Sequence, residues 1–72
     1  MLTSQELTNL LRERGYKVTP QRLAVYEALA DETWHPNGEM LFNKLQPKFS
    51  AMSFATVYTT VEILNDINVI QI

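Results

Sequence analysis

The longest amphipathic stretch of the chain covers residues 53–65, and it opens with Ser53, a favourable N-cap residue. Apolar residues recur in it at the i, i+3, i+4 and i+7 spacing of a core-facing helix, namely Phe54, Val57, Val61 and Leu64. The opposite face carries mostly small side chains and hydroxyls with one aromatic ring: Ala55, Thr56, Tyr58, Thr59 and Glu62. This pattern predicts a helix that can lie close against a flat or grooved partner, because little of that face needs to stay hydrated.

Three earlier helices are predicted from capping residues and apolar spacing. Residues 3–14 open with a Thr-x-x-Glu capping box and are followed by glycine. Residues 19–30 open with Thr-Pro, an N-cap followed by proline at the first helical position. Residues 37–46 open with an Asn N-cap and end before a proline. The residues expected to face the core of these helices are Leu7, Leu10, Leu11, Leu23, Val25, Tyr26, Leu29, Met40, Leu41 and Leu45.

Residues 67–72 alternate weakly and are rich in β-branched side chains, which predicts a strand. A strand that ends a domain without a partner is an unsatisfied edge, so it either pairs with another chain or belongs to a longer protein. The order of elements is helix, helix, helix, turn, helix, strand. It predicts a mainly α fold, a winged helix-turn-helix of four helices plus the start of a β wing.

The composition predicts one small globular domain spanning residues 1–72. A chain of 72 residues has a marginal core, and the lack of cysteine excludes a disulfide or a thiolate metal site. No apolar run approaches the roughly 20 residues of a membrane span, and the N-terminus lacks the pattern of a signal peptide. A cytoplasmic protein without a membrane partner is therefore expected.

The charges are unevenly distributed. The formal net charge of −2 by itself argues mildly against nucleic-acid binding. Four of the six basic residues nevertheless fall in one short stretch, at Arg12, Arg14, Lys17 and Arg22. Because screening limits the reach of distant charges to roughly 10 Å, such a local patch can still bind phosphate.

Three segments together resemble the ferric uptake regulator family, with the peroxide-responsive repressors as the most similar branch: Gly15-Tyr16-Lys17-Val18-Thr19-Pro20-Gln21-Arg22, His35-Pro36 and Met52-Ser53-Phe54-Ala55-Thr56-Val57-Tyr58. The resemblance covers the chain from about residue 10 to residue 70. It implies a bacterial, metal-dependent, dimeric transcription repressor whose N-terminal winged helix binds an A/T-rich palindromic operator on double-stranded DNA. Its C-terminal half would dimerise and carry most metal ligands. Only the N-terminal half is matched, so the chain is expected to be a fragment lacking that C-terminal domain.

The helix over residues 53–65 is the expected reader of DNA. The resemblance implies that Tyr58 contacts DNA, with its ring on a thymine methyl group or its hydroxyl on a phosphate. Thr59 follows, where the family often has Arg or Asn; it can meet a base edge but cannot make the bidentate guanine contact of an arginine. Ala55 is small enough to allow entry into the groove. The alternative is that Tyr58 is a half-buried flank of the core.

Phosphate contacts are expected from both sides of this helix. Ser53 and Thr56 lie at its N-terminus, where free N–H groups suit a phosphate oxygen. The alternative for Ser53 is plain capping, which is compatible with a phosphate contact by the backbone N–H groups. The resemblance implies that Lys17 enters an A/T-rich minor groove, whose narrow width concentrates negative potential. Arg22 occupies a first helical turn, where a cation opposes the helix dipole, so a phosphate contact is its expected role. The alternative for both is a solvated charge.

His35 is the single histidine of the chain. The resemblance implies a regulatory metal ligand that is completed by ligands from the missing domain, with Fe²⁺ or Mn²⁺ and a structural Zn²⁺ in the full-length parent. One imidazole cannot close such a site, so no metal is expected in this chain alone. The alternative is a loop histidine packed beside Trp34.

The expected function is sequence-specific DNA binding by a metal-dependent repressor of the ferric uptake or peroxide-response type. The alternative is a winged-helix protein–protein interaction module without DNA binding, which the acidic net charge favours. Salt dependence distinguishes the two, because phosphate binding weakens steeply with salt. No enzyme is expected, since no nucleophile–base pair or glycine-rich phosphate loop is present.

Overall fold

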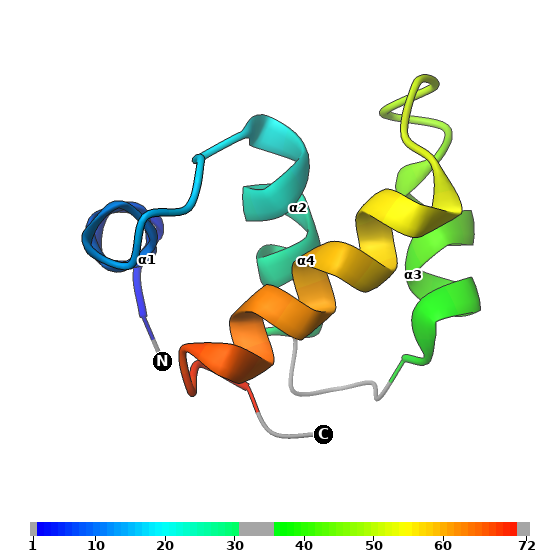
Figure 1. Ribbon diagram of the computed structural model, residues 1–72. Helices are drawn as coiled ribbons and strands as arrows, with labels where there is room; N and C mark the ends of the chain where they lie inside the picture. The colour runs from blue at the N-terminus through cyan, green and yellow to red at the C-terminus, as the bar shows by residue number, and fades with distance from the viewer. Residues whose placement is uncertain (1, 31–35, 71–72) are drawn as a thin grey trace.

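The computed structural model describes residues 2–30 and 36–70, and within them the chain forms four α-helices. They are α1 (Ser4–Glu13), α2 (Pro20–Leu29), α3 (Gly38–Leu45) and α4 (Phe54–Asp66). Helix α4 packs against both α2 and α3, which also pack against each other, while α1 lies on the side of α2 away from α3 (Figure 1). Within the same residues, no helix has the length and apolar character that crossing a bilayer requires.

Each helix begins at the N-cap residue predicted for it. The side chains of Thr3, Thr19, Asn37 and Ser53 each accept a hydrogen bond from the backbone N–H three residues later. At Thr3 the capping box is complete, because its own backbone N–H donates to Glu6 Oε1 at 2.9 Å. These bonds satisfy first-turn N–H groups that would otherwise have no partner inside the helix.

The capping box makes the stability of the first turn of α1 dependent on pH. The pKa of the Glu6 carboxyl is lowered, first by the backbone N–H of Thr3 and then by its side chain. A lowered folded-state pKa contributes stability that is present above the ordinary value of 4.5 and is lost as the pH falls through the folded-state value. Glu6→Gln keeps a capping side chain without the titration. The difference in unfolding free energy between wild type and Glu6→Gln is therefore expected to shrink from neutral pH to about pH 3 in urea titrations. A difference that stays constant over this range would contradict the assignment.

The core lies where the four helices meet. Most of the residues expected from the helical spacing are buried there: Leu7, Leu11, Val25, Tyr26, Leu41, Leu45, Val57 and Leu64. The prediction that Met40 and Phe54 lie in the core is wrong, because Met40 is 44% exposed and Phe54 is 39% exposed. Leu41 and Leu45 occupy the inner side of α3, which turns the neighbouring Met40 outward. Phe54 is the first residue of α4 and packs against Phe42 of α3, at the edge of the core.

Five buried residues of the described part of the chain were not predicted as core: Ala28, Met52, Thr60, Ile63 and Ile67. Met52, in the turn before α4, is 3% exposed. Thr60 is 1% exposed, and its hydroxyl donates to the backbone carbonyl of Thr56 at 2.8 Å. This bond within the helix satisfies the hydroxyl, so that a polar residue can lie among the apolar ones at low cost.

The prediction of a strand from Ile67 is wrong for residues 67–70, which form a turn, and residues 71–72 lie outside the described residues. Asn68 has a φ of 61°, and its N–H donates to the carbonyl of Asn65 at 3.1 Å. The next N–H, that of Val69, donates to the carbonyl of Leu64 at 3.0 Å. These two bonds form a Schellman motif, in which asparagine adopts the left-handed conformation that ends a helix.

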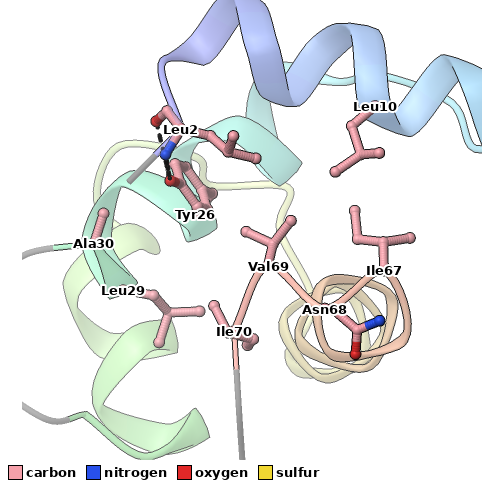
Figure 2. A pocket seen from close by; sticks show the side chains of 9 residues that line it. All are labelled: Leu2, Leu10, Tyr26, Leu29, Ala30, Ile67, Asn68, Val69 and Ile70. Carbon is pink, nitrogen blue, oxygen red and sulfur yellow. Dashed lines mark hydrogen bonds between the residues drawn. The ribbon is translucent and has the colours of Figure 1, made fainter.

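The turn brings the end of the chain back towards α1 and α2. An apolar groove of about 560 Å³ lies between them, lined by Leu2, Leu10, Tyr26, Leu29, Ala30, Ile67, Asn68, Val69 and Ile70 (Figure 2). The hydroxyl of Tyr26 donates to the carbonyl of Leu2 and accepts from its N–H, both at 3.0 Å. These bonds hold the start of the chain against α2.

Candidate nucleic-acid interface

The outward face of α4 is bordered on the α3 side by a row of three aromatic rings that pack against one another at tilted angles. The ring centroids of Phe54 and Tyr58 are 4.9 Å apart, and those of Phe42 and Phe54 are 5.4 Å apart. Tyr58 remains 48% exposed. A Cβ atom built on Gly38 would lie only 2.8 Å from Tyr58 Cζ, so the ring lies directly over the start of α3. Tyr58 is thus packed along one side and open along the other.

On the α2 side, the same face is bordered by a small cavity. Its volume is about 190 Å³, and it is lined by Arg22 from α2 together with Ala55, Thr56, Thr59 and Thr60 from α4. The only charged residue of this lining is Arg22; the others are one alanine and three threonines. The packing of α2 on α4 therefore brings together four residues that were singled out from the sequence, from positions more than thirty residues apart: Arg22, Ala55, Thr56 and Thr59.

Arg22 also connects this cavity to the segment before α2. Its Nη1 donates to the backbone carbonyl of Lys17 at 2.8 Å, and its backbone N–H donates to Thr19 Oγ1 at 3.1 Å. A guanidinium has five N–H donors. One of them is used in the hydrogen bond to the Lys17 carbonyl, so others remain for an anion. Lys17 itself is exposed and precedes α2. Arg22 therefore holds the backbone from which the Lys17 side chain extends.

The N-terminus of α4 uses its hydroxyls internally. Ser53 Oγ accepts from the backbone N–H of Thr56 at 3.1 Å and shares a hydrogen bond with Thr56 Oγ1 at 3.0 Å. The plain capping role that was the alternative for Ser53 is thus observed. The backbone N–H groups of Phe54 and Ala55 precede the first intrahelical donor, so the capping bond leaves them available for an anion.

The expected metal ligand, His35, lies outside the described residues. In the part of the chain that the structure describes, no three residues among His, Cys, Asp and Glu are grouped so as to hold a metal ion. The donor set of residues 2–30 and 36–70 accordingly does not fit a closed iron, manganese or zinc site.

Two contributors to this face were missed at the sequence level. The sequence analysis gives Gly38 no role, and it assigns Phe54 to the core. The signal for Phe54 was present, because side chains four residues apart, such as Phe54 and Tyr58, are neighbours on a helix surface. No local signal points to Gly38, since its contact with Tyr58 arises from the packing of α3 on α4.

The four helices have the arrangement of the helical part of a winged helix-turn-helix domain, with α3 and α4 as the helix-turn-helix, and residues 13–72 match the model of the ferric uptake regulator family. The chain belongs to this family.

Among curated proteins, the chain is 34% identical over 61 residues to "Peroxide-responsive repressor PerR" of Staphylococcus epidermidis, covering 85% of this chain and 41% of that protein. It is 33% identical over 67 residues to "Peroxide operon regulator" of Bacillus subtilis, covering 93% and 46%. The chain thus spans less than half the length of these relatives.

Solved structures agree with this assignment. The structure described as "GAS PerR-Zn-Zn" superposes with a TM-score of 0.82 at 33% identity, covering 89% of this chain and 41% of that one. A PerR structure from Streptococcus pyogenes, described in terms of peroxide sensing and gene regulation, gives a TM-score of 0.81 at 34% identity, covering 92% and 46%. The four helices of this chain therefore have the arrangement found in part of each PerR chain.

Proposed function

We propose that this chain binds double-stranded DNA in a sequence-specific manner, as the DNA-binding domain of a metal-dependent transcription repressor of the ferric uptake or peroxide-response type. The observation that carries the proposal is the cavity in which Arg22 lies beside Ala55, Thr56 and Thr59 of α4. A cation is held there next to a helix face of small side chains, on the second helix of a helix-turn-helix. Such a face can enter a major groove while the cation meets the phosphate backbone.

Within this proposal the residues divide by the part of DNA that they meet. Tyr58 and Thr59 contact bases, and the small Ala55 lets the helix approach them. Ser53, Thr56 and Arg22 contact phosphates at the groove edge, and Lys17 extends into an A/T-rich minor groove. The exposed position of Lys17 and the exposed edge of Tyr58 support these roles. No catalytic step is part of the proposal.

We further propose that metal sensing and dimerisation reside in a full-length cytoplasmic protein in which this domain is the N-terminal part. The support is that the matched relatives are more than twice as long as this chain, and that the description of one similar structure names zinc twice. In such a protein His35 would join ligands of the second domain to hold Fe²⁺ or Mn²⁺, a structural Zn²⁺ would lie in that domain, and a homodimer would match a palindromic operator.

The test is a fluorescence anisotropy titration of the 72-residue chain against an A/T-rich palindrome and a scrambled duplex at several salt concentrations. Binding is expected to weaken with salt with a log–log slope of about −2 per bound chain, because two cations displace counterions from the DNA: Arg22 on a phosphate and Lys17 in the minor groove. Tyr58→Ala is expected to weaken binding to the palindrome about tenfold and to leave binding to the scrambled duplex almost unchanged.

Tyr58→Phe is the matched control, since it keeps the ring and removes only the hydroxyl. It distinguishes contact through the ring, which it preserves, from a phosphate contact through the hydroxyl. An affinity for DNA that is weak and insensitive to salt would sink the proposal and would support the protein-interaction module instead.

A further inference from the structure

Phe54 is unusually exposed for a large apolar residue in a small domain. It is 39% exposed, although burial of a phenylalanine side chain stabilises a fold by about 1.5–3 kcal/mol. Its ring lies between that of Phe42, on the core side, and that of Tyr58, which is 48% exposed, with tilted contacts to both. The rings of Phe54 and Tyr58 meet at an interplanar angle of 53°, so that together they present an apolar surface on the outside of α4.

This surface is continuous with the proposed DNA-binding face. Phe54 and Tyr58 border that face on the α3 side, and the Arg22 cavity borders it on the α2 side. The apolar feature of a major groove is the 5-methyl group of thymine, which aromatic and other apolar side chains contact. Two adjacent rings on the helix that enters the groove therefore suit two neighbouring thymines.

We propose that Phe54 is a specificity-determining residue, which together with Tyr58 reads the 5-methyl groups of two neighbouring thymines, and that Gly38 positions the Tyr58 ring for this contact. The inference rests on the proposed DNA-binding function and adds to it a residue and the chemical group that it recognises. The competing occupant of the same surface is an apolar patch of a protein partner.

Gly38 sets the position of Tyr58 through the space that it leaves. A Cβ atom at residue 38 would lie 2.8 Å from Tyr58 Cζ and 3.0 Å from both Cε1 and Oη. Those atoms belong to the outer end of a half-exposed side chain, which can move without disturbing the core. Alanine also favours a helix more than glycine does. Gly38→Ala is therefore expected to fold at least as well as wild type while displacing the Tyr58 ring.

The test uses the 72-residue chain and an A/T-rich palindrome to which it binds, chosen from a pool of randomised duplexes. Thymines are replaced one at a time by uracil, which pairs in the same way but lacks the 5-methyl group. Wild type is expected to lose about fourfold in affinity at each of two neighbouring positions, as expected for one buried methyl-sized group. Phe54→Ala is expected to bind thymine and uracil equally at one of these positions, and Gly38→Ala at the other.

Phe54→Leu is the matched variant, because it keeps an apolar side chain and is expected to retain part of the discrimination. Circular dichroism at the assay temperature verifies that each variant is folded. If DNA binds but Phe54→Ala keeps the wild-type loss at both positions, this inference is overturned and the proposed function stands. If Phe54→Ala binds the thymine duplex as tightly as wild type does, the ring pair is assigned to a protein partner. If no duplex in the pool binds, the proposed function itself fails.

Discussion

Replacing Leu41 with alanine is expected to lower the free energy of unfolding by about 2–5 kcal/mol. The Leu41 side chain is fully buried between α3 and its neighbours, so the substitution removes apolar contacts and leaves a cavity. A domain of this length is stabilised by only roughly 4–10 kcal/mol in total. Leu41→Ala is therefore expected to shift the midpoint of urea unfolding, followed by far-UV circular dichroism, to a much lower urea concentration.

Met40 provides the control for this measurement, because it is adjacent in the same helix and is 44% exposed. Met40→Ala is expected to cost less than about 1 kcal/mol, since it removes a side chain that is already largely in contact with water. Similar losses for the two variants would contradict the orientation of α3. A large loss for Met40→Ala alone would mean that the helix is rotated from the observed position.

The comparison of Met40 with Leu41 also shows what the helical spacing could not decide. The pattern of α3 marks an apolar side of the helix, and both residues lie within it. Which of them is buried depends on where α2 and α4 lie, and this is a property of the packed domain. Phe54 illustrates the same limit at the start of α4, where a residue within the apolar stripe projects beyond the edge of the core.

The helix starts were predictable because their signals are local. Each capping bond connects residues three apart in sequence, so the residue types alone define the geometry. The end of α4 has an equally local signal in Asn68, which adopts the left-handed conformation of a Schellman motif. The strand prediction gave more weight to the β-branched residues around Asn68, and over residues 67–70 the capping preference prevails.

The residue types of the candidate site could be predicted from the sequence, but the contacts between its helices could not. The outward face of α4 follows from the helical period, and Thr56, Tyr58 and Thr59 could be chosen from it. The approach of Arg22 to that face depends on the crossing of α2 and α4, and the support of Tyr58 by Gly38 depends on the packing of α3. Both contacts join residues at least twenty positions apart, so no spacing rule could indicate them.

The packing of Arg22 leads to the largest effect expected on DNA binding. Arg22→Ala is expected to weaken binding to the palindrome about 100-fold at low salt and to reduce the log–log salt slope by about two units. One unit comes from the phosphate contact of Arg22 itself. The other comes from Lys17, whose backbone carbonyl accepts a 2.8 Å hydrogen bond from Arg22 Nη1 and loses its support in the variant. Lys17→Ala alone is expected to reduce the slope by about one unit.

Arg12→Ala is the matched control, because it removes the same charge from an exposed position at the last turn of α1. It is expected to leave the salt slope unchanged, whereas two solvated arginines would give equal and small effects. A loss of fold is not expected for Arg22→Ala, since a cation in the first turn of α2 opposes the helix dipole.

The double variant Lys17→Ala/Arg22→Ala is expected to bind no more weakly than Arg22→Ala, because Lys17 depends on Arg22 for its position. Independent, additive losses from the two residues would show instead that the hydrogen bond between them does not position Lys17 for DNA.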